Sequence, residues 1–258
     1  MNIFLKKAVL AAAIAGAAGV AQADVVGGQT DTASPFQIGT ADNGTAGASV
    51  TGQIGGVTAG FTSHFARATY QNTATGVYNV SGRRLVADGA PGPELPFADH
   101  SGLGVWYFAK AGSDDVWYGT WSGESTTGAI GTKVAGTHNA WYVGENGDVA
   151  TTLPVSATYT VRSINNSTQT ATSQLSATFN GGSNGTASST GDIVFTGGSI
   201  NTVGNDVRLA ASSVSVASNG GSGGTLSGNF YGTGASSVAG AVAFSNRDLN
   251  TAFGGTKN

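Results

Sequence analysis

Apolar residues alternate with small polar residues through most of the second half of the chain, and this alternation limits the possible folds strongly. Residues 157–161 read Ala-Thr-Tyr-Thr-Val, which places the two threonines on one face of an extended strand and the apolar residues on the other. Residues 175–179 repeat the pattern, and similar segments separated by Gly, Asn and Ser follow as far as residue 244. Short strands with such turns predict an antiparallel sandwich or barrel.

The composition excludes several classes of protein. The chain has no cysteine, which excludes disulfides, zinc–thiolate sites, Fe–S clusters and thiol catalysis. Its formal net charge is -3 and its lysines are scattered, so it lacks the basic stripe on which nucleic-acid binding depends. It also has no H-E-x-x-H or EF-hand motif, and no grouping of Ser, His and an acidic residue stands out, so we expect a protein that is not an enzyme.

The first 23 residues have the pattern of a secretory signal peptide. Lys6 and Lys7 precede an apolar run from Ala8 to Val20, and Ala21-Gln22-Ala23 forms an A-x-A cleavage site. The run is too short for a bilayer-spanning helix, which needs about 20 residues. We expect a secreted, extracellular protein that uses the Sec route, and without a cysteine at the cleavage point we expect no lipid anchor.

The remainder of the first half is rich in aromatic residues and carries a Pro-bearing stretch at residues 83–100, which indicates a long loop. The aromatic-rich sequence gives way to alternating apolar and small polar residues near Gly136, and this change predicts a domain boundary. The expected organisation is a signal peptide at 1–23, an N-terminal β domain at 24–136 and a C-terminal β domain at 137–258.

The three histidines are the candidate ligands for a bound group. Neutral imidazole is a common axial ligand of haem iron, an apolar wall keeps out water, and an arginine can pair with a propionate. The histidines are His64, His100 and His138; the neighbouring aromatic residues are Phe65, Tyr70, Trp106 and Phe108; the neighbouring arginines are Arg67, Arg83 and Arg84. These residues are compatible with a haem pocket, while the alternative for the aromatic residues is an ordinary hydrophobic core.

The C-terminal residues resemble a known family. Gly-Asn-Phe-Tyr-Gly at 228–232, Val-Ala-Gly-Ala-Val at 238–242 and Ala-Phe-Gly-Gly-Thr-Lys at 252–257 are similar to the end of the C-terminal barrel in transferrin-binding protein B and its relatives. Those proteins pass through the Slam outer-membrane translocon. The resemblance implies that this chain uses a Slam-type translocon as well.

A second resemblance is to the hemophilin group of secreted haem carriers. It rests on His-Ser-Gly-Leu-Gly-Val-Trp at 100–106, Asp-Val-Trp-Tyr-Gly-Thr-Trp at 115–121 and Trp-Tyr-Val-Gly-Glu-Asn at 141–146. The implied fold is all-β, with an N-terminal ligand-binding (handle or clamp) domain before an antiparallel barrel of about eight strands. The implied function is a hemophore that takes haem b from host proteins such as haemoglobin and delivers it to a TonB-dependent outer-membrane receptor. The alternative is a secreted Slam-dependent protein that binds a host or symbiont protein without a cofactor.

We expect His64 and His100 to hold the haem iron from opposite sides, because both lie among aromatic residues. His138, at the predicted junction, is the alternative, and whether one or two histidines bind the iron is left open. Arg83 and Arg84 are the candidates for the propionates, with Arg67 in reserve. Phe65, Tyr70, Trp106 and Phe108 are the candidates for the apolar walls.

Overall fold

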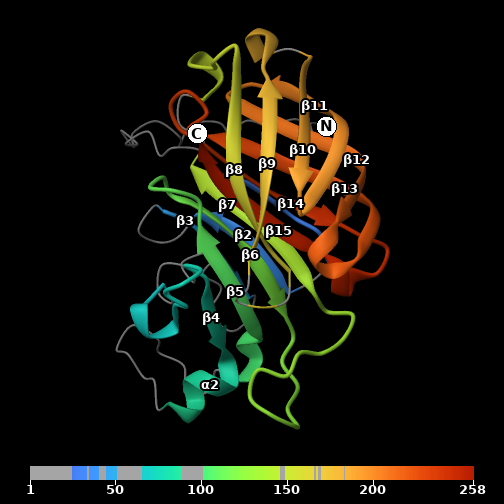
Figure 1. Ribbon diagram of the computed structural model, residues 1–258. Helices are drawn as coiled ribbons and strands as arrows, with labels where there is room; N and C mark the ends of the chain where they lie inside the picture. The colour runs from blue at the N-terminus through green and yellow to red at the C-terminus, as the bar shows by residue number, and fades with distance from the viewer. Residues whose placement is uncertain are drawn as a thin grey trace, which may run out of the picture.

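A computed structural model describes residues 25–33, 35–40, 45–50, 66–88, 101–145, 149–165, 167, 170–182 and 184–258. The predicted signal peptide, His64, Phe65 and His100 lie outside these residues. The described chain forms two β units (Figure 1), one before residue 146 and one after residue 155.

The second unit is a closed antiparallel barrel, which confirms the predicted architecture. Within the described residues it has eight strands, in the order β10-β11-β12-β13-β14-β15-β8-β9, and β9 pairs with β10 to close it. The strands are β8 (Ser156–Ile164), β9 (Ala171–Thr178), β10 (Gly185–Gly191), β11 (Ile193–Val203), β12 (Asp206–Val216), β13 (Gly221–Tyr231), β14 (Ser237–Ala243) and β15 (Thr251–Lys257).

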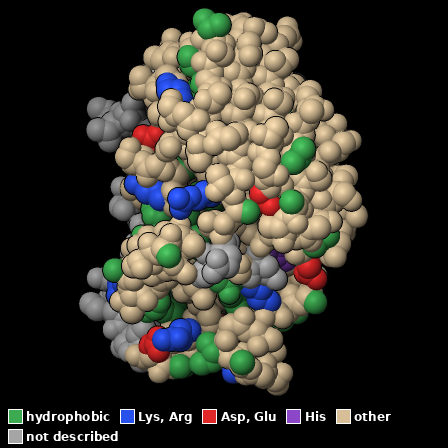
Figure 2. Space-filling view, in the orientation of Figure 1, with side chains coloured by type: hydrophobic (Ala, Val, Ile, Leu, Met, Phe, Trp, Pro, Cys, Tyr) green, Lys and Arg blue, Asp and Glu red, His purple; other side chains and the backbone are tan. Residues whose placement is uncertain are grey.

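Alternation along the strands sorts side chains between the inside and the outside of the barrel. On β12, Val207 and Leu209 are buried in the interior while Arg208 is exposed. Phe179 and Phe230 meet edge to face in the interior, with ring centroids 4.9 Å apart. The outward positions are mainly Ser, Thr and Asn, and the barrel part of the face in Figure 2 accordingly shows few charged side chains.

The first unit is a twisted antiparallel sheet with strand order β1-β7-β6-β5-β4. Its strands are β1 (Val25–Gln29), β4 (Tyr78–Ser81), β5 (Val105–Lys110), β6 (Val116–Ser122) and β7 (Asn139–Glu145). A hairpin of β2 (Phe36–Thr40) and β3 (Ala46–Val50) covers one face. Phe36 of this hairpin lies 5.3 Å from Trp106 and 5.5 Å from Trp141, measured between ring centroids.

The other face of the sheet packs against the barrel. Val116 and Ala140 of the sheet are buried in one apolar cluster with Ala239, Ala241 and Ala252 of β14 and β15. The two layers come so close that a Cβ atom on Gly254 would overlap the ring of Tyr118. Small residues on β14 and β15 therefore allow the sheet and the barrel to share one core.

The sheet ends later in the chain than the composition predicts. The boundary expected near Gly136 assigns the next strand to the barrel half, but β7 pairs with β6 and β1 of the sheet. The barrel begins at Ser156. Residue composition could not place this boundary, because a strand buried on both faces has no polar alternation that indicates which sheet it joins.

The connections between these strands contain only short helical segments among the described residues. They are α2 (Gly82–Ala87) and the 3₁₀ turns η1 (Ala68–Tyr70), η2 (Ser101–Leu103), η3 (Val149–Thr151), η4 (Asn180–Gly182), η5 (Ala217–Asn219) and η6 (Arg247–Leu249). In this described part, no helix has the length and apolar character needed to cross a bilayer.

Candidate functional site

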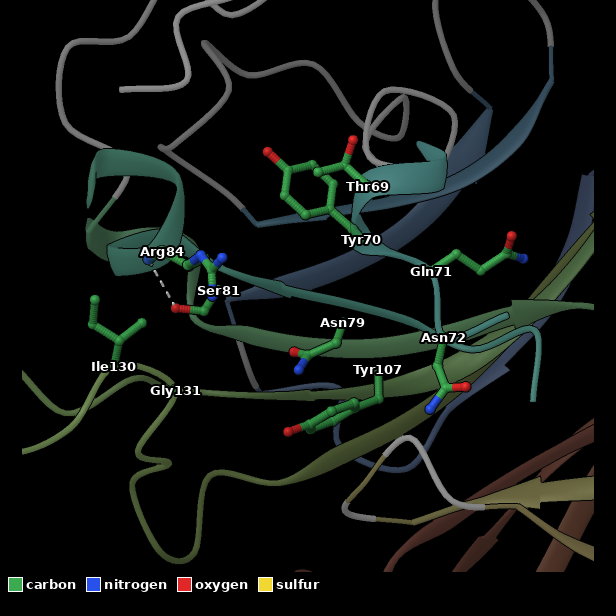
Figure 3. A pocket seen from close by; sticks show the side chains of 10 residues that line it. All are labelled: Thr69, Tyr70, Gln71, Asn72, Asn79, Ser81, Arg84, Tyr107, Ile130 and Gly131. Atoms are coloured by element: carbon green, nitrogen blue, oxygen red, sulfur yellow. Dashed lines mark hydrogen bonds between the residues drawn. The ribbon is translucent and has the colours of Figure 1, made fainter. Parts of the chain in front are cut away.

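A cavity of about 380 Å³ lies at the β4 edge of the sheet, between η1, α2 and the loop of residues 123–137. This volume lies toward the lower end of the range of about 300–1,000 Å³ that is usual for ligand pockets. Figure 3 shows Asn79 and Tyr107 on one side of the cavity with Tyr70 and Arg84 on the opposite side. The residues lining the cavity are Thr69, Tyr70, Gln71, Asn72, Asn79, Ser81, Arg84, Tyr107, Ile130 and Gly131.

Strand alternation decides which side chains reach this cavity. Asn79 of β4 is the cross-strand partner of Tyr107 on β5, and the two side chains point to the same face. Tyr107 stands between Trp106 and Phe108 in the sequence, so it points away from both. The sequence analysis missed Tyr107, although its place in the alternation was a signal that could have identified it.

Trp106 and Phe108 do not line this cavity and are packed in the core of the sheet, and their predicted role as walls of a ligand pocket stays a prediction. Both are fully buried under the β2–β3 hairpin. Trp106 donates its indole N–H to the Leu103 carbonyl at 2.7 Å, and Phe108 stacks on Tyr78 with ring centroids 5.0 Å apart. Their burial fits the alternative of a hydrophobic core.

Arg83 is held by the loop of residues 123–137. Its guanidinium donates to the carbonyl oxygens of Ser125, Gly128 and Ala129 at 3.0–3.3 Å, and its backbone N–H donates to the Glu124 carboxylate at 3.0 Å. These bonds fix the loop beside α2. Arg83 thus holds the cavity wall, and its predicted role of binding a propionate stays a prediction.

Arg84 does face the cavity, as expected for a residue that binds an anion. It follows Ser81, whose hydroxyl caps α2 by accepting from the Arg84 backbone N–H at 3.2 Å. Its Nε atom donates to the Asp88 carboxylate at 2.7 Å, and this hydrogen bond raises the pKa of Arg84. Tyr70, on the same side of the cavity, adds a smaller effect on this pKa in the same direction.

Arg67 lies just outside the cavity. Its side chain is exposed, and its carbonyl oxygen accepts from the Tyr70 backbone N–H at 2.9 Å to begin η1. The residue positions Tyr70 through its backbone. Of the residues predicted to surround a ligand, the structure brings Tyr70 and Arg84 together in this cavity.

His138 is a structural residue at the junction of the sheet and the barrel. Its Nε2 atom donates to the Asn250 carbonyl at 2.9 Å, so its Nδ1 atom accepts from the Ser122 hydroxyl at 3.0 Å. Burial lowers the pKa of His138 to about 4, and the nearby charge of Lys133 adds to this effect. Both ring nitrogens are engaged, which disfavours the alternative role of His138 as an iron ligand.

Lys133 is a second residue that the sequence analysis did not single out. Its ammonium lies over the ring of Tyr107, with Nζ 4.2 Å from the ring centroid. Burial lowers the pKa of Lys133 to about 7, against a smaller opposing effect of Asp248. No pattern near Lys133 pointed to this role, because the contact joins a loop to a strand that is 26 positions away in the sequence.

The structure is similar to parts of several transferrin-binding proteins. Intact Ap-TbpB, with N and C lobes, is 12% identical with a TM-score of 0.37, and the match covers 59% of this chain and 35% of that chain. The isotype 1 TbpB from serogroup B Neisseria meningitidis is 14% identical with a TM-score of 0.38, covering 60% and 33%. This chain spans about a third of the length of these two structures. Similarity this low assigns neither a ligand nor a partner.

A family model gives the more specific match. The model of the HphA N-terminal heme-binding domain matches residues 20–134, which include β1 to β6 and every residue that lines the cavity. This match agrees with the haem-binding family indicated by the sequence resemblance, and it supports haem as the ligand. Residues 20–134, which are less than half of the chain, are thus similar to a haem-binding domain of the HphA type.

Proposed function

We propose that this protein is a hemophore, a binding protein that carries haem and does not act on it as an enzyme. The single observation that carries the proposal is the match of residues 20–134 to the HphA heme-binding domain. The hydrogen-bond donors of the cavity suit the edge of haem that carries its carboxylates. Arg84 supplies a cation and Tyr70 and Tyr107 supply hydroxyl groups, which suit the carboxylates of haem b rather than its apolar ring.

The proposed iron ligands are His64 and His100. Both lie outside the described residues, and both are joined by short stretches of chain to described elements of this domain. His64 precedes Ala66 by two residues, and His100 directly precedes η2. Two imidazoles leave haem iron no open coordination position, which suits carriage rather than the activation of dioxygen.

The proposed route begins with secretion. The pattern at residues 1–23 supports export through Sec, and the resemblance of residues 228–257 to Slam-dependent proteins supports passage through an outer-membrane translocon. Outside the cell, the carrier would take haem from host proteins such as haemoglobin and transfer it to a TonB-dependent receptor.

Titration with hemin tests both the carrier and its ligands. We expect the purified protein to develop a Soret band with low-spin character, and we expect His64→Ala and His100→Ala each to lose that low-spin character. His138→Gln is the matched control, since it removes a histidine whose two ring nitrogens are already hydrogen-bonded to Ser122 and Asn250. A parent protein without a Soret band would contradict haem carriage, and His64→Ala and His100→Ala spectra identical to the parent would contradict the ligand pair.

A further inference from the structure

The cavity has the chemistry of a site for anions. Of the described residues that line it, none is acidic, while Arg84, Tyr70, Tyr107, Gln71, Asn72 and Asn79 can all donate hydrogen bonds. A carboxylate that leaves water needs such donors and a compensating cation, because an unpaired buried charge is very costly. The Glu124 carboxylate lies beside this lining, but it already accepts from the Ser81 hydroxyl and from the Arg83 and Gly131 backbone N–H groups. The remaining donors favour a negatively charged ligand group over a neutral one.

Arg84 has N–H donors that its pairing with Asp88 does not use. Its pairing with Asp88 uses the Nε atom, and its two terminal amino groups have no hydrogen-bond partner among the described residues. The side chain is 62% exposed, on the opposite side of the cavity from Tyr107. Arginine can present two parallel N–H groups to one carboxylate, so a second acceptor can bind while Asp88 stays in place.

Tyr107 and Lys133 offer a second cationic position. The phenol oxygen of Tyr107 has no hydrogen-bond partner among the described residues, and the ring lines the cavity. Lys133 is not part of the lining itself, but its ammonium lies on the Tyr107 ring. Because its side chain has four methylene groups, the ammonium can move from the ring toward a carboxylate that is hydrogen-bonded to the phenol.

We propose that this cavity binds the two propionates of haem, with Arg84 holding one and the Tyr107–Lys133 pair the other, so that the carboxylate edge of the porphyrin points into the protein. This inference rests on the proposed function and adds the orientation of the ligand. The cavity volume of about 380 Å³ suits one edge of a tetrapyrrole rather than the whole ring. Two cationic positions on opposite sides match two carboxylates that extend from adjacent pyrroles.

The experiment compares hemin with hemin dimethyl ester, which has the same ring and iron but no charged carboxylates. The parent protein should bind the ester at least about 10-fold more weakly than hemin, because a hydrogen bond to a charged group contributes roughly a factor of ten or more to binding. Arg84→Gln and Lys133→Gln should each weaken hemin by about 10-fold and leave the affinity for the ester nearly unchanged. The low-spin spectrum should persist in both variants.

Two matched controls separate this effect from a general loss of positive charge. Arg208→Gln removes an exposed arginine that pairs with Asp206 on the barrel, as Arg84 pairs with Asp88. Lys110→Gln removes a lysine whose Nζ lies 5.7 Å from the Trp117 ring centroid. Both controls should bind hemin like the parent.

Equal affinity of the parent for hemin and its dimethyl ester would overturn the inward orientation, whichever variants fold. Unchanged hemin affinity in both Arg84→Gln and Lys133→Gln would overturn the assignment of the two cations. In either case a normal Soret band would leave the proposed haem carriage intact. A parent protein that binds neither compound would instead contradict the proposed function itself, and the orientation with it.

Discussion

Three consecutive aromatic residues on β5 have different roles because a strand turns successive side chains to opposite faces. Trp106 and Phe108 are buried against Phe36 and Tyr78, whereas Tyr107 reaches the cavity and supports the ammonium of Lys133. A substitution at Trp106 would therefore act through the stability of the fold. A substitution at Tyr107 would act first on the cavity and the position of Lys133.

Neighbouring arginines also differ in role. Arg83 donates to three carbonyl oxygens of the 123–137 loop, and Arg84 faces the cavity. The two side chains leave α2 in different directions because adjacent helical positions do not share a face. The residue type alone could not predict that these two arginines have different roles.

The buried state of His138 predicts a loss of stability in acid. Its pKa is lowered from an ordinary value of 6.5 to about 4, so the unfolded chain binds the proton more readily than the folded one. Stability is complete above pH 6.5 and falls as the pH decreases toward 4, by about 3 kcal/mol for this residue. The charged neighbours are Lys133, Arg247 and Asp248.

Urea unfolding of the ligand-free protein at pH 7.5 and at pH 4.5 measures this effect. The parent should lose more free energy of unfolding between the two pH values than His138→Gln, which cannot take up a proton there. The variant is expected to be less stable at pH 7.5, because the Ser122 and Asn250 groups lose a well-placed partner. The same pH slope in both proteins would show that His138 does not stay neutral in the fold.

At the scale of the elements, the contact between β15 and β6 requires a glycine on β15. Gly254 on β15 lies against the ring of Tyr118 on β6, and a Cβ atom would overlap that ring. Gly254→Ala should therefore force the two layers apart and lower the free energy of unfolding by about 1–3 kcal/mol. A lower urea midpoint would be the direct measure.

Gly123→Ala is the matched control for this substitution. A Cβ atom there has its nearest neighbour, Thr137 Oγ1, at 3.4 Å, which is an ordinary contact. The control should unfold at nearly the parent midpoint. Equal midpoints for Gly254→Ala and the parent would mean that the sheet and barrel are less closely packed than described.

The strand elements were predictable where one face is polar and the other apolar, as on β8, β9 and β12. The alternation of Val207, Arg208 and Leu209 is enough to predict a strand with one buried face. The pairing of β7 was not predictable, since Trp141, Tyr142 and Val143 are all buried and carry no preference for either neighbour. Of the residues that line the cavity, Tyr70 and Arg84 were candidates from the sequence, whereas the contact of Lys133 with Tyr107 depends on how a loop folds back over a strand.

At the scale of the whole molecule, the sheet and the barrel should unfold as one cooperative unit. They share a buried apolar cluster, and polar contacts join their ends. Tyr231 donates its hydroxyl to the Val26 carbonyl at 3.1 Å, Asp114 accepts from Ser236 and Ser237, and Arg247 pairs with Asp31. Each unit alone would expose the apolar surface of this junction to water.

Two optical probes can test this cooperativity, because all four tryptophans of the chain lie on β5, β6 and β7 of the sheet: Trp106, Trp117, Trp121 and Trp141. Tryptophan fluorescence therefore reports on the sheet, while far-ultraviolet circular dichroism is dominated by the longer barrel strands. The two thermal unfolding curves should coincide.

Ala241→Gln, which places a longer polar side chain between the layers, should lower both midpoints together. Ser176→Gln, at an exposed position on β9, should change neither midpoint. A fluorescence transition several degrees below the dichroism transition in the parent would instead indicate two units that unfold separately.

The cavity is lined, among its described residues, only by side chains from residues 69–131, and the barrel contributes none. Selection can therefore act on the two halves with little interference. The outer barrel surface can therefore vary without altering the lining of the cavity. The interior of the barrel and its contact with β6 and β7 do not share this freedom, because they hold the floor of the cavity in place.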